Sequence, residues 1–209
     1  MSNNKNNTFI DYKYICIKKD IFDVNVINLN YNNIENNNIE IIYKSPSIIL
    51  DCIFLKTPPI SSNIISIYHK EKYTNNITIK LLLNKKEHHQ FIEIMKSIDE
   101  NLSKNINNFI NTMESSIDVN NFNNVKTLSS LRYEQIIKYK HNYNYTENTG
   151  NTDENYQIYL KSYLDKNTIS ELEKKLNKKY IFTFNISNIY LSTNSLIPLI
   201  KCNYCEIVN

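Results

Sequence analysis

Rings and positive charges alternate in the stretch IIKYKHNYNY, residues 136 to 145, which has no apolar anchor after its first two residues. Single-stranded nucleic acid is bound by this combination, because cations track the phosphates while aromatic rings stack on the bases. Stacking contributes about 1–3 kcal/mol per base and tolerates any base sequence. The candidate binding residues in and beyond this stretch are Arg132, Tyr133, Lys138, Tyr139, Lys140, Tyr143, Tyr145, Lys161 and Tyr163.

Two other interpretations of these tyrosines stay open. Alternating tyrosines also suit a half-buried strand, and tyrosine is enriched at protein–protein interfaces. AT-rich coding raises the tyrosine, asparagine, isoleucine and lysine content together. The net charge of +3 permits a basic face but does not by itself require a nucleic-acid partner.

Catalytic motifs are missing from the sequence. It has neither a glycine-rich phosphate motif nor a nucleophile elbow nor HExxH, and its only glycine is Gly150. His89 and Glu93 are one helical turn apart, a spacing that can hold a metal, but a solvated helix turn explains them as well. We therefore expect no enzyme activity and no cofactor.

Cys202 and Cys205 form a single CxxC motif near the C-terminal end. A structural zinc site needs four ligands, and the sequence offers no matching second pair. The plain alternative is a strand in which one cysteine faces inward and the other outward. We expect that no metal is needed, and a small zinc-dependent transcription factor is the weakest functional alternative.

The sequence predicts two helices in the fold that positions the candidate binding residues. Apolar side chains recur at steps of three and four from Phe91 to Met113, which predicts a long amphipathic helix over about 85–114. Asn84 is the expected N-cap, with Glu87 completing a capping box.

A second, shorter helix is predicted over about 168–178. Thr168 and Glu171 have the spacing of a capping box at its start.

Short β-branched runs surround the long helix. NIISIYHK with NITIKLLL predicts one hairpin, and YIFTFNISNIYL with SLIPLIKCNYCEIV predicts another. The expected fold is therefore α+β, a mostly antiparallel OB-like barrel or sheet with two helices. We expect one domain over 9–209 after a disordered tail over 1–8. No apolar run is long enough to span a membrane.

The order of these segments resembles single-stranded DNA-binding proteins of large eukaryotic DNA viruses. FLKTPPI is followed by a hairpin ending ITIKLLL and by a long helix containing FIEIMKSIDENL. Later come the segment from Tyr133 to Lys138, the strand YQIYLKSYL and the closing hairpin YIFTFNISNIYLSTNSLIPLIKC. The resemblance covers roughly residues 40 to 207. SSN stands where that family has glycine after the TP segment, and CEIVN lacks the family's acidic tail.

The resemblance implies an OB-like barrel related to phage replication proteins, and a non-enzymatic role. Such a protein coats single-stranded DNA, or RNA, during replication, recombination or repair. It would form oligomers on the strand and contact replication proteins. Lys56 beside the TPP bend and Lys161 would then help line the groove. The N-terminal stretch MSNNKNNT lacks the charged and apolar regions of a signal peptide, so we expect an intracellular location. With the resemblance, that location would be a viral factory of the host cytoplasm or the nucleus. A structural or protein-interaction domain of a viral particle is the main alternative.

Overall fold

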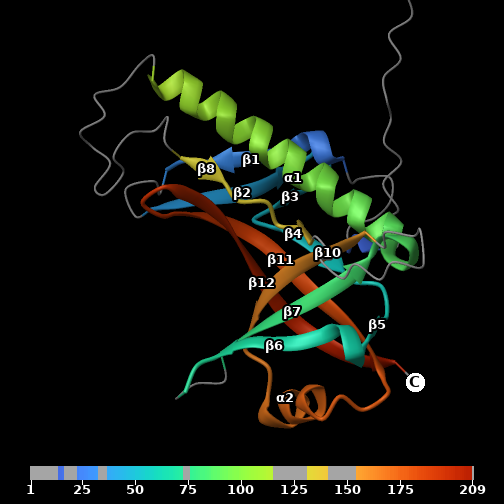
Figure 1. Ribbon diagram of the computed structural model, residues 1–209. Helices are drawn as coiled ribbons and strands as arrows, with labels where there is room; N and C mark the ends of the chain where they lie inside the picture. Colours follow the sequence, from blue (N-terminus) through green and yellow to red (C-terminus); the bar gives the residue numbers. More distant parts are fainter. Residues whose placement is uncertain are drawn as a thin grey trace, which may run out of the picture.

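The computed structural model describes residues 14–16, 23–32, 37–72, 76–114, 131–140 and 154–208. They form an α+β fold in which a large, mostly antiparallel sheet is accompanied by two helices (Figure 1). The strands are β1 (Ile27–Asn30), β2 (Asn38–Lys44), β3 (Ile49–Leu50), β4 (Ile53–Lys56), β5 (Ile60–Ser61), β6 (Ile65–Lys70), β7 (Ile77–Asn84), β8 (Arg132–Tyr133), β9 (Lys138–Lys140), β10 (Asn155–Ser162), β11 (Lys179–Leu191) and β12 (Ser195–Val208). The helices are α1 (Lys85–Glu114) and α2 (Lys166–Glu173), with 3-10 turns η2 (Val24–Val26) and η4 (Ser62–Ile64).

The main path of the sheet runs β1-β2-β11-β12-β10-β7-β6, and the short strands attach to its sides. Neighbours are antiparallel, except that β12 pairs with β10 and with β8 in parallel. Both predicted hairpins are confirmed as β6–β7 and β11–β12. Among the described strands no pairing joins β1 to β6. The mostly antiparallel sheet is therefore confirmed, and it is open.

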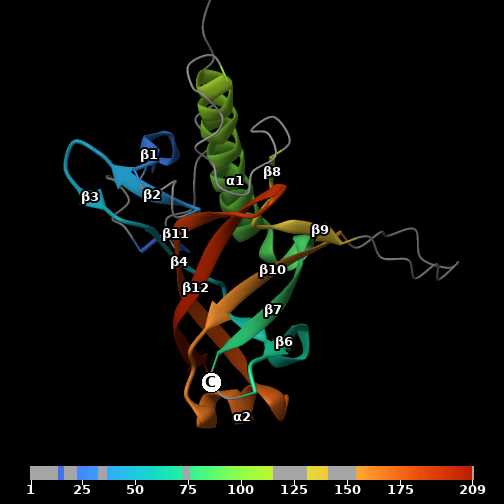
Figure 2. The same ribbon diagram turned by 90° about the vertical axis from the view of Figure 1, so that its left-hand side faces the viewer.

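Strict alternation of burial gives the sheet one dry face. In β7 and β10 every second side chain is buried, beginning with Ile77 in β7 and Tyr156 in β10. Since strand side chains alternate between the two faces, the buried set of both strands lines one common core. α1 lies across one end of this core and α2 closes the other (Figure 2). The opposite face of these strands carries the partly exposed residues.

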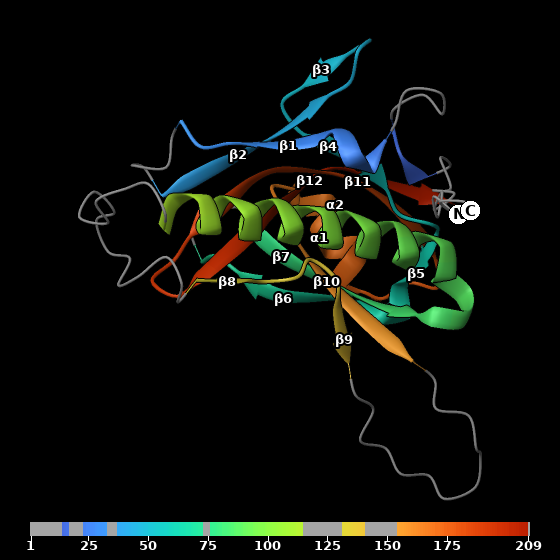
Figure 3. The ribbon, with the colours of Figure 1, turned by 90° about the horizontal axis from the view of Figure 1, so that it is seen from above.

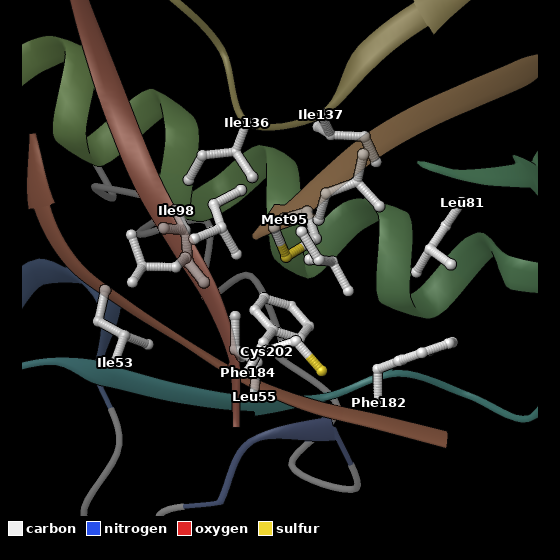
Figure 4. Packing of buried hydrophobic residues seen from close by; sticks show 14 of the residues in the cluster. Ile53, Leu55, Leu81, Met95, Ile98, Ile136, Ile137, Phe182, Phe184 and Cys202 are labelled. Atoms are coloured by element: carbon white, nitrogen blue, oxygen red, sulfur yellow. The ribbon is translucent and has the colours of Figure 1, made fainter. Parts of the chain in front are cut away.

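α1 spans the predicted 85–114, and its bounds are confirmed. Its apolar stripe is buried in the core, with Met95 and Ile98 directed toward Phe184 of β11 (Figure 4). The helix lies lengthwise over the sheet (Figure 3). Burying each such side chain contributes about 1.5–3 kcal/mol. No helix in the described part of the chain, α1 included, has the length and apolar character that a membrane span requires.

Asn84 caps the N-terminus of α1 as predicted, but the partner of its backbone amide is not the predicted Glu87. The Asn84 side chain accepts hydrogen bonds from the amides of Lys86 at 2.8 Å and Glu87 at 3.4 Å. The Asn84 amide donates to Nδ1 of buried His88, at 3.2 Å, so His88 takes the place expected for the Glu87 carboxylate. His88 has a non-helical backbone (φ −118°, ψ 21°), which turns its ring back onto the cap.

α2 begins earlier and is shorter than predicted. The Asp165 carboxylate accepts from the amides of Asn167 and Thr168, so the helix starts before Thr168. Thr168 is therefore not the cap, and the expected box with Glu171 is wrong. The chain leaves the helix after Glu173, and Lys175 adopts a positive φ of 46° that no helix continues through.

Candidate nucleic-acid interface

The outward-facing side chains of β10 and β7 include both an aromatic ring and positive charges. Tyr159 and Lys161 of β10 stand opposite Lys80 and Thr78 of β7 in the register of the two strands. These residues occupy the positions between the buried ones, so they point away from the core.

The same face continues across β12, β11 and β4. Lys201 of β12 is the parallel neighbour of Lys161, and Asn185 of β11 stands on its other side. One step along, Thr183 of β11 pairs with Tyr204 of β12 and with Lys56 of β4. Figure 2 shows β12, β10, β7 and β6 side by side, with α1 above and α2 below them.

A third ring reaches this face from β6. The β-bulge between Ile67 and His69 carries Tyr68, whose ring meets that of Tyr159 edge to face at 4.9 Å. Tyr68 is 64% exposed and Tyr204 is 60% exposed. Rings with that much open area are available to stack on bases. We define the outer sheet face as Lys56, Tyr68, Lys80, Tyr159, Lys161, Lys201 and Tyr204.

The lysines of the outer sheet face lie apart from the ion pairs seen in the described part of the chain. Among the described residues none of Lys56, Lys80, Lys161 and Lys201 makes an ion pair. Elsewhere lysines are paired, for example Lys70 with Glu173 at 3.2 Å. Like charges directly opposite each other in a sheet are destabilising, typically by a few tenths of a kcal/mol to about 1 kcal/mol. The adjacent Lys161 and Lys201 therefore form an electrostatically costly arrangement that an anion would relieve.

The structure places three of the predicted binding residues in or beside this region. Lys56 and Lys161 belong to the outer sheet face. Tyr163 follows β10 and is 68% exposed. Lys56 and Lys161 come from strands far apart in the sequence, and β11 and β12 bring them onto one face.

Strand β9 divides its predicted residues between two sides. Lys138 and Lys140 pair with Gln157 and Asn155 and so lie on the same side of the sheet as Tyr159. Tyr139 pairs with Tyr156 and lies on the other side, where the two rings meet at 5.4 Å. Lys138 is also bound to Glu134, with 3.0 Å between its Nζ and the carboxylate.

Tyr133 serves the packing of α1. Its hydroxyl donates to Asp99 of α1 at 2.8 Å, and the same carboxylate accepts from the amides of Ile136 at 2.8 Å and Ile137 at 3.0 Å. Burial raises the pKa of Asp99 to about 6, although these three hydrogen bonds act in the opposite direction. Tyr133 thus ties the 131–140 segment to the long helix and lies apart from the outer sheet face.

Arg132 is exposed in β8, which pairs with β12 at Ser195, six residues along the strand from Lys201. At about 3.3 Å per residue that is roughly 20 Å. Tyr143 and Tyr145 lie outside the described residues.

Cys202 and Cys205 both face the core, contrary to the alternative of one inward and one outward. The register shift between Thr183 and Phe184 leaves an extra residue in β12, which resets the alternation, so Cys202 pairs with Phe184 and Cys205 with Phe182. Burial raises the pKa of Cys202 to about 11 and that of Cys205 to about 12. The described residues contain no group of three or more metal-ligating side chains.

Sequence reasoning missed Tyr68, Lys80, Tyr159, Lys201 and Tyr204. Their signal is weak, since each is one polar or aromatic residue in an apolar run, as in ITIKLLL and LIKCNYC. Comparisons with models of protein families, with curated proteins and with solved structures find no match. The likeness to viral single-stranded DNA-binding proteins therefore stays a prediction.

Proposed function

We propose that this protein binds single-stranded nucleic acid, DNA in the first place, on the outer sheet face and without catalysing a reaction. One observation carries the proposal: four lysines without ion-pair partners among the described residues share this face with three tyrosines. Lysines supply the electrostatic part of binding, and the rings supply stacking surfaces. Each of these components is independent of base sequence.

The proposal includes an OB-like character for the sheet. OB-folds bind single strands on the outside of a coiled antiparallel sheet, using aromatic side chains and a basic groove. A strand bound here would cross β12, β10 and β7, because the lysines are distributed over neighbouring strands. The protein would coat strands exposed during replication, recombination or repair, inside the cell and with several copies along one strand.

The rings also discriminate between single strands and duplex. Bases in a duplex are stacked on one another and offer no open face to Tyr68 or Tyr159. Duplex therefore keeps only the contribution of the lysines, and we expect it to bind more weakly at moderate salt.

Anisotropy of a fluorescent oligo(dT) tests the proposal. Replacing Tyr68 and Tyr159 together by Ala should weaken binding by about 1–3 kcal/mol for each base that stacks, while the salt dependence stays unchanged. Tyr139→Ala is the matched control, because Tyr139 is also partly exposed but lies on the other side of the sheet.

Equal affinity of the wild-type chain for single strand and duplex would refute the stacking part of the proposal. Absence of binding to any oligonucleotide at low salt would refute it entirely. If the tyrosines served a protein interface instead, as in the viral-particle alternative, the double variant would change the oligomeric mass and leave the affinity for oligo(dT) unaltered. The four lysines of the outer sheet face, which have no ion-pair partner among the described residues, argue against that alternative, because lysine is depleted in protein interfaces.

A further inference from the structure

A lysine-rich segment joins α2 to β11 at the end of the core opposite α1 (Figure 2). We define the lysine loop as residues 174–179. Lys174, Lys175 and Lys179 are exposed, and within the part of the chain that the structure describes none of the three makes an ion pair. Lys178 is paired with Glu171 of α2 at 3.8 Å. The loop therefore presents a cluster of positive charge to solvent.

The backbone of the lysine loop is held by Ser62 of η4, which is buried. The Ser62 hydroxyl donates a hydrogen bond to the carbonyl of Leu176, and the Ser62 amide donates to the carbonyl of Lys178 at 3.0 Å. Lys175 has a left-handed backbone, with φ 46°, a conformation that glycine adopts at lower cost. The lysines are thus displayed from a fixed backbone, so an anion that binds them has little chain to order.

The lysine loop continues the outer sheet face along β11. Lys179 and Thr183 both occupy positions between the buried residues of this strand, so both point away from the core. Thr183 pairs with Lys56 of β4 and with Tyr204 of β12, which belong to the outer sheet face. Lys179 lies four residues before Thr183, roughly 13 Å at about 3.3 Å per residue. A strand that leaves the outer sheet face at Lys56 and Tyr204 reaches the lysine loop by following β11.

We propose that the lysine loop binds phosphates of the same nucleic-acid strand that occupies the outer sheet face. The inference rests on the proposed function and extends it to a longer site with two unlike parts. Residues 174–179 contain no aromatic side chain, so the loop contributes charge without stacking. An acidic protein segment would also meet these charges. The continuity with the outer sheet face favours the strand, and so does the depletion of lysine in protein interfaces.

Glu206 of β12 lies between the two parts of the site. It pairs with Ile181 of β11, which faces outward like Lys179, and it is exposed. A phosphate that passes from Tyr204 to the lysine loop therefore meets a like charge at Glu206. Glu206→Gln should tighten the binding of a long oligonucleotide and leave that of a short one unchanged. Unchanged binding of the long oligonucleotide would exclude this path.

The test compares oligo(dT) of about 5 nucleotides with oligo(dT) of about 16, near the two ends of the range of OB-fold site sizes. Calorimetry with oligonucleotide in excess over protein keeps one protein on each strand. The short oligonucleotide should contact the outer sheet face alone. The long one should also neutralise phosphates at Lys174, Lys175 and Lys179, which makes the slope of log K against log salt more negative by about 2.

Variants assign the difference to the lysine loop. Replacing Lys174 and Lys175 together by Gln should reduce the slope for the long oligonucleotide by about 1.4 and leave the short one unaffected. The matched control replaces Lys86 and Lys104 by Gln, which removes the same charge from exposed positions of α1 at the other end of the core. Lys175→Gly separates binding from folding. Because glycine suits the positive φ, this variant should weaken binding of the long oligonucleotide without lowering the melting temperature.

The outcomes distinguish this inference from the proposed function. Equal slopes for the two oligonucleotides, or a Lys174/Lys175 variant that behaves as the α1 control does, overturn the role of the lysine loop alone. A loop that served an acidic protein segment would give that same result, since its variant would bind the long oligonucleotide as the wild-type chain does. A wild-type chain that binds neither oligonucleotide overturns the proposed function.

Discussion

Replacing Lys161 and Lys201 together by Gln should weaken single-strand binding and leave the protein at least as stable. The two lysines are direct neighbours across β10 and β12, and no described carboxylate pairs with either. Their mutual repulsion opposes folding, whereas both attract a polyanion. The double substitution thus changes stability and binding in opposite directions.

The magnitudes follow from the number of phosphates that are neutralised. For single strands, log K falls against log salt with a slope of about −0.7 per neutralised phosphate. If Lys56, Lys80, Lys161 and Lys201 each meet one phosphate, the slope is about −2.8, and the double variant halves it to about −1.4. Relief of the like-charge pair should raise the free energy of unfolding by up to about 1 kcal/mol.

The assay is anisotropy of labelled oligo(dT) over a series of salt concentrations, with urea unfolding on the same samples. The control replaces Lys70 and Lys178 by Gln, which removes the same total charge from two lysines that are paired with glutamates of α2. The reasoning is refuted if the control lowers the slope as much as the Lys161/Lys201 variant does. It is also refuted if the Lys161/Lys201 variant keeps the wild-type slope.

Three further predictions concern the core, and a fourth concerns metal. Ile98→Asp places an unpaired charge at a fully buried position of α1, so the variant should be unfolded by circular dichroism, and a folded variant would contradict the packing described. The pKa of Asp99 in the folded protein, about 6, exceeds its ordinary value of 3.8. Between these two values the folded state holds a proton that the unfolded state releases. The free energy of unfolding should therefore fall by roughly 2–3 kcal/mol as the pH rises from about 4 through about 6. Urea midpoints across that range should show the fall, and Asp99→Asn should remove it. The thiols of Cys202 and Cys205, with pKa values of about 11 and 12, should resist alkylation at pH 8 until the chain unfolds. Treatment with a chelator should leave the melting temperature unchanged.

The sequence was sufficient for features that depend on one local period. The apolar stripe of three- and four-residue steps gave both ends of α1, and alternation located the β6–β7 and β11–β12 hairpins. Capping was less certain, because several neighbouring polar side chains compete for the same free amides. Asp165 starts α2 ahead of Thr168, and His88 occupies the place expected for Glu87.

The composition of the candidate site depended on contacts that no local pattern contains. A period of two assigns a side chain to one face of its own strand, but it names neither the neighbouring strand nor the register. The sequence alone therefore treated the cluster at 132–145 as one site, although β9 directs Tyr139 away from Lys138 and Lys140. Tyr133 is held by Asp99, from a helix 34 residues earlier in the chain.

The sequence by itself determined the class of the fold, the long helix and the abundance of tyrosine and lysine. Only the tertiary structure decided which of them share a surface. Lys56, Lys80, Lys161 and Lys201 come from four strands, and the pairings of β11, β12 and β10 set them on one face. A single bulge likewise turned both cysteines of the CxxC motif into the core. Pairing partners and bulges are chosen by the packing of the whole core, because the free energy of each arrangement depends on side chains distant in the sequence.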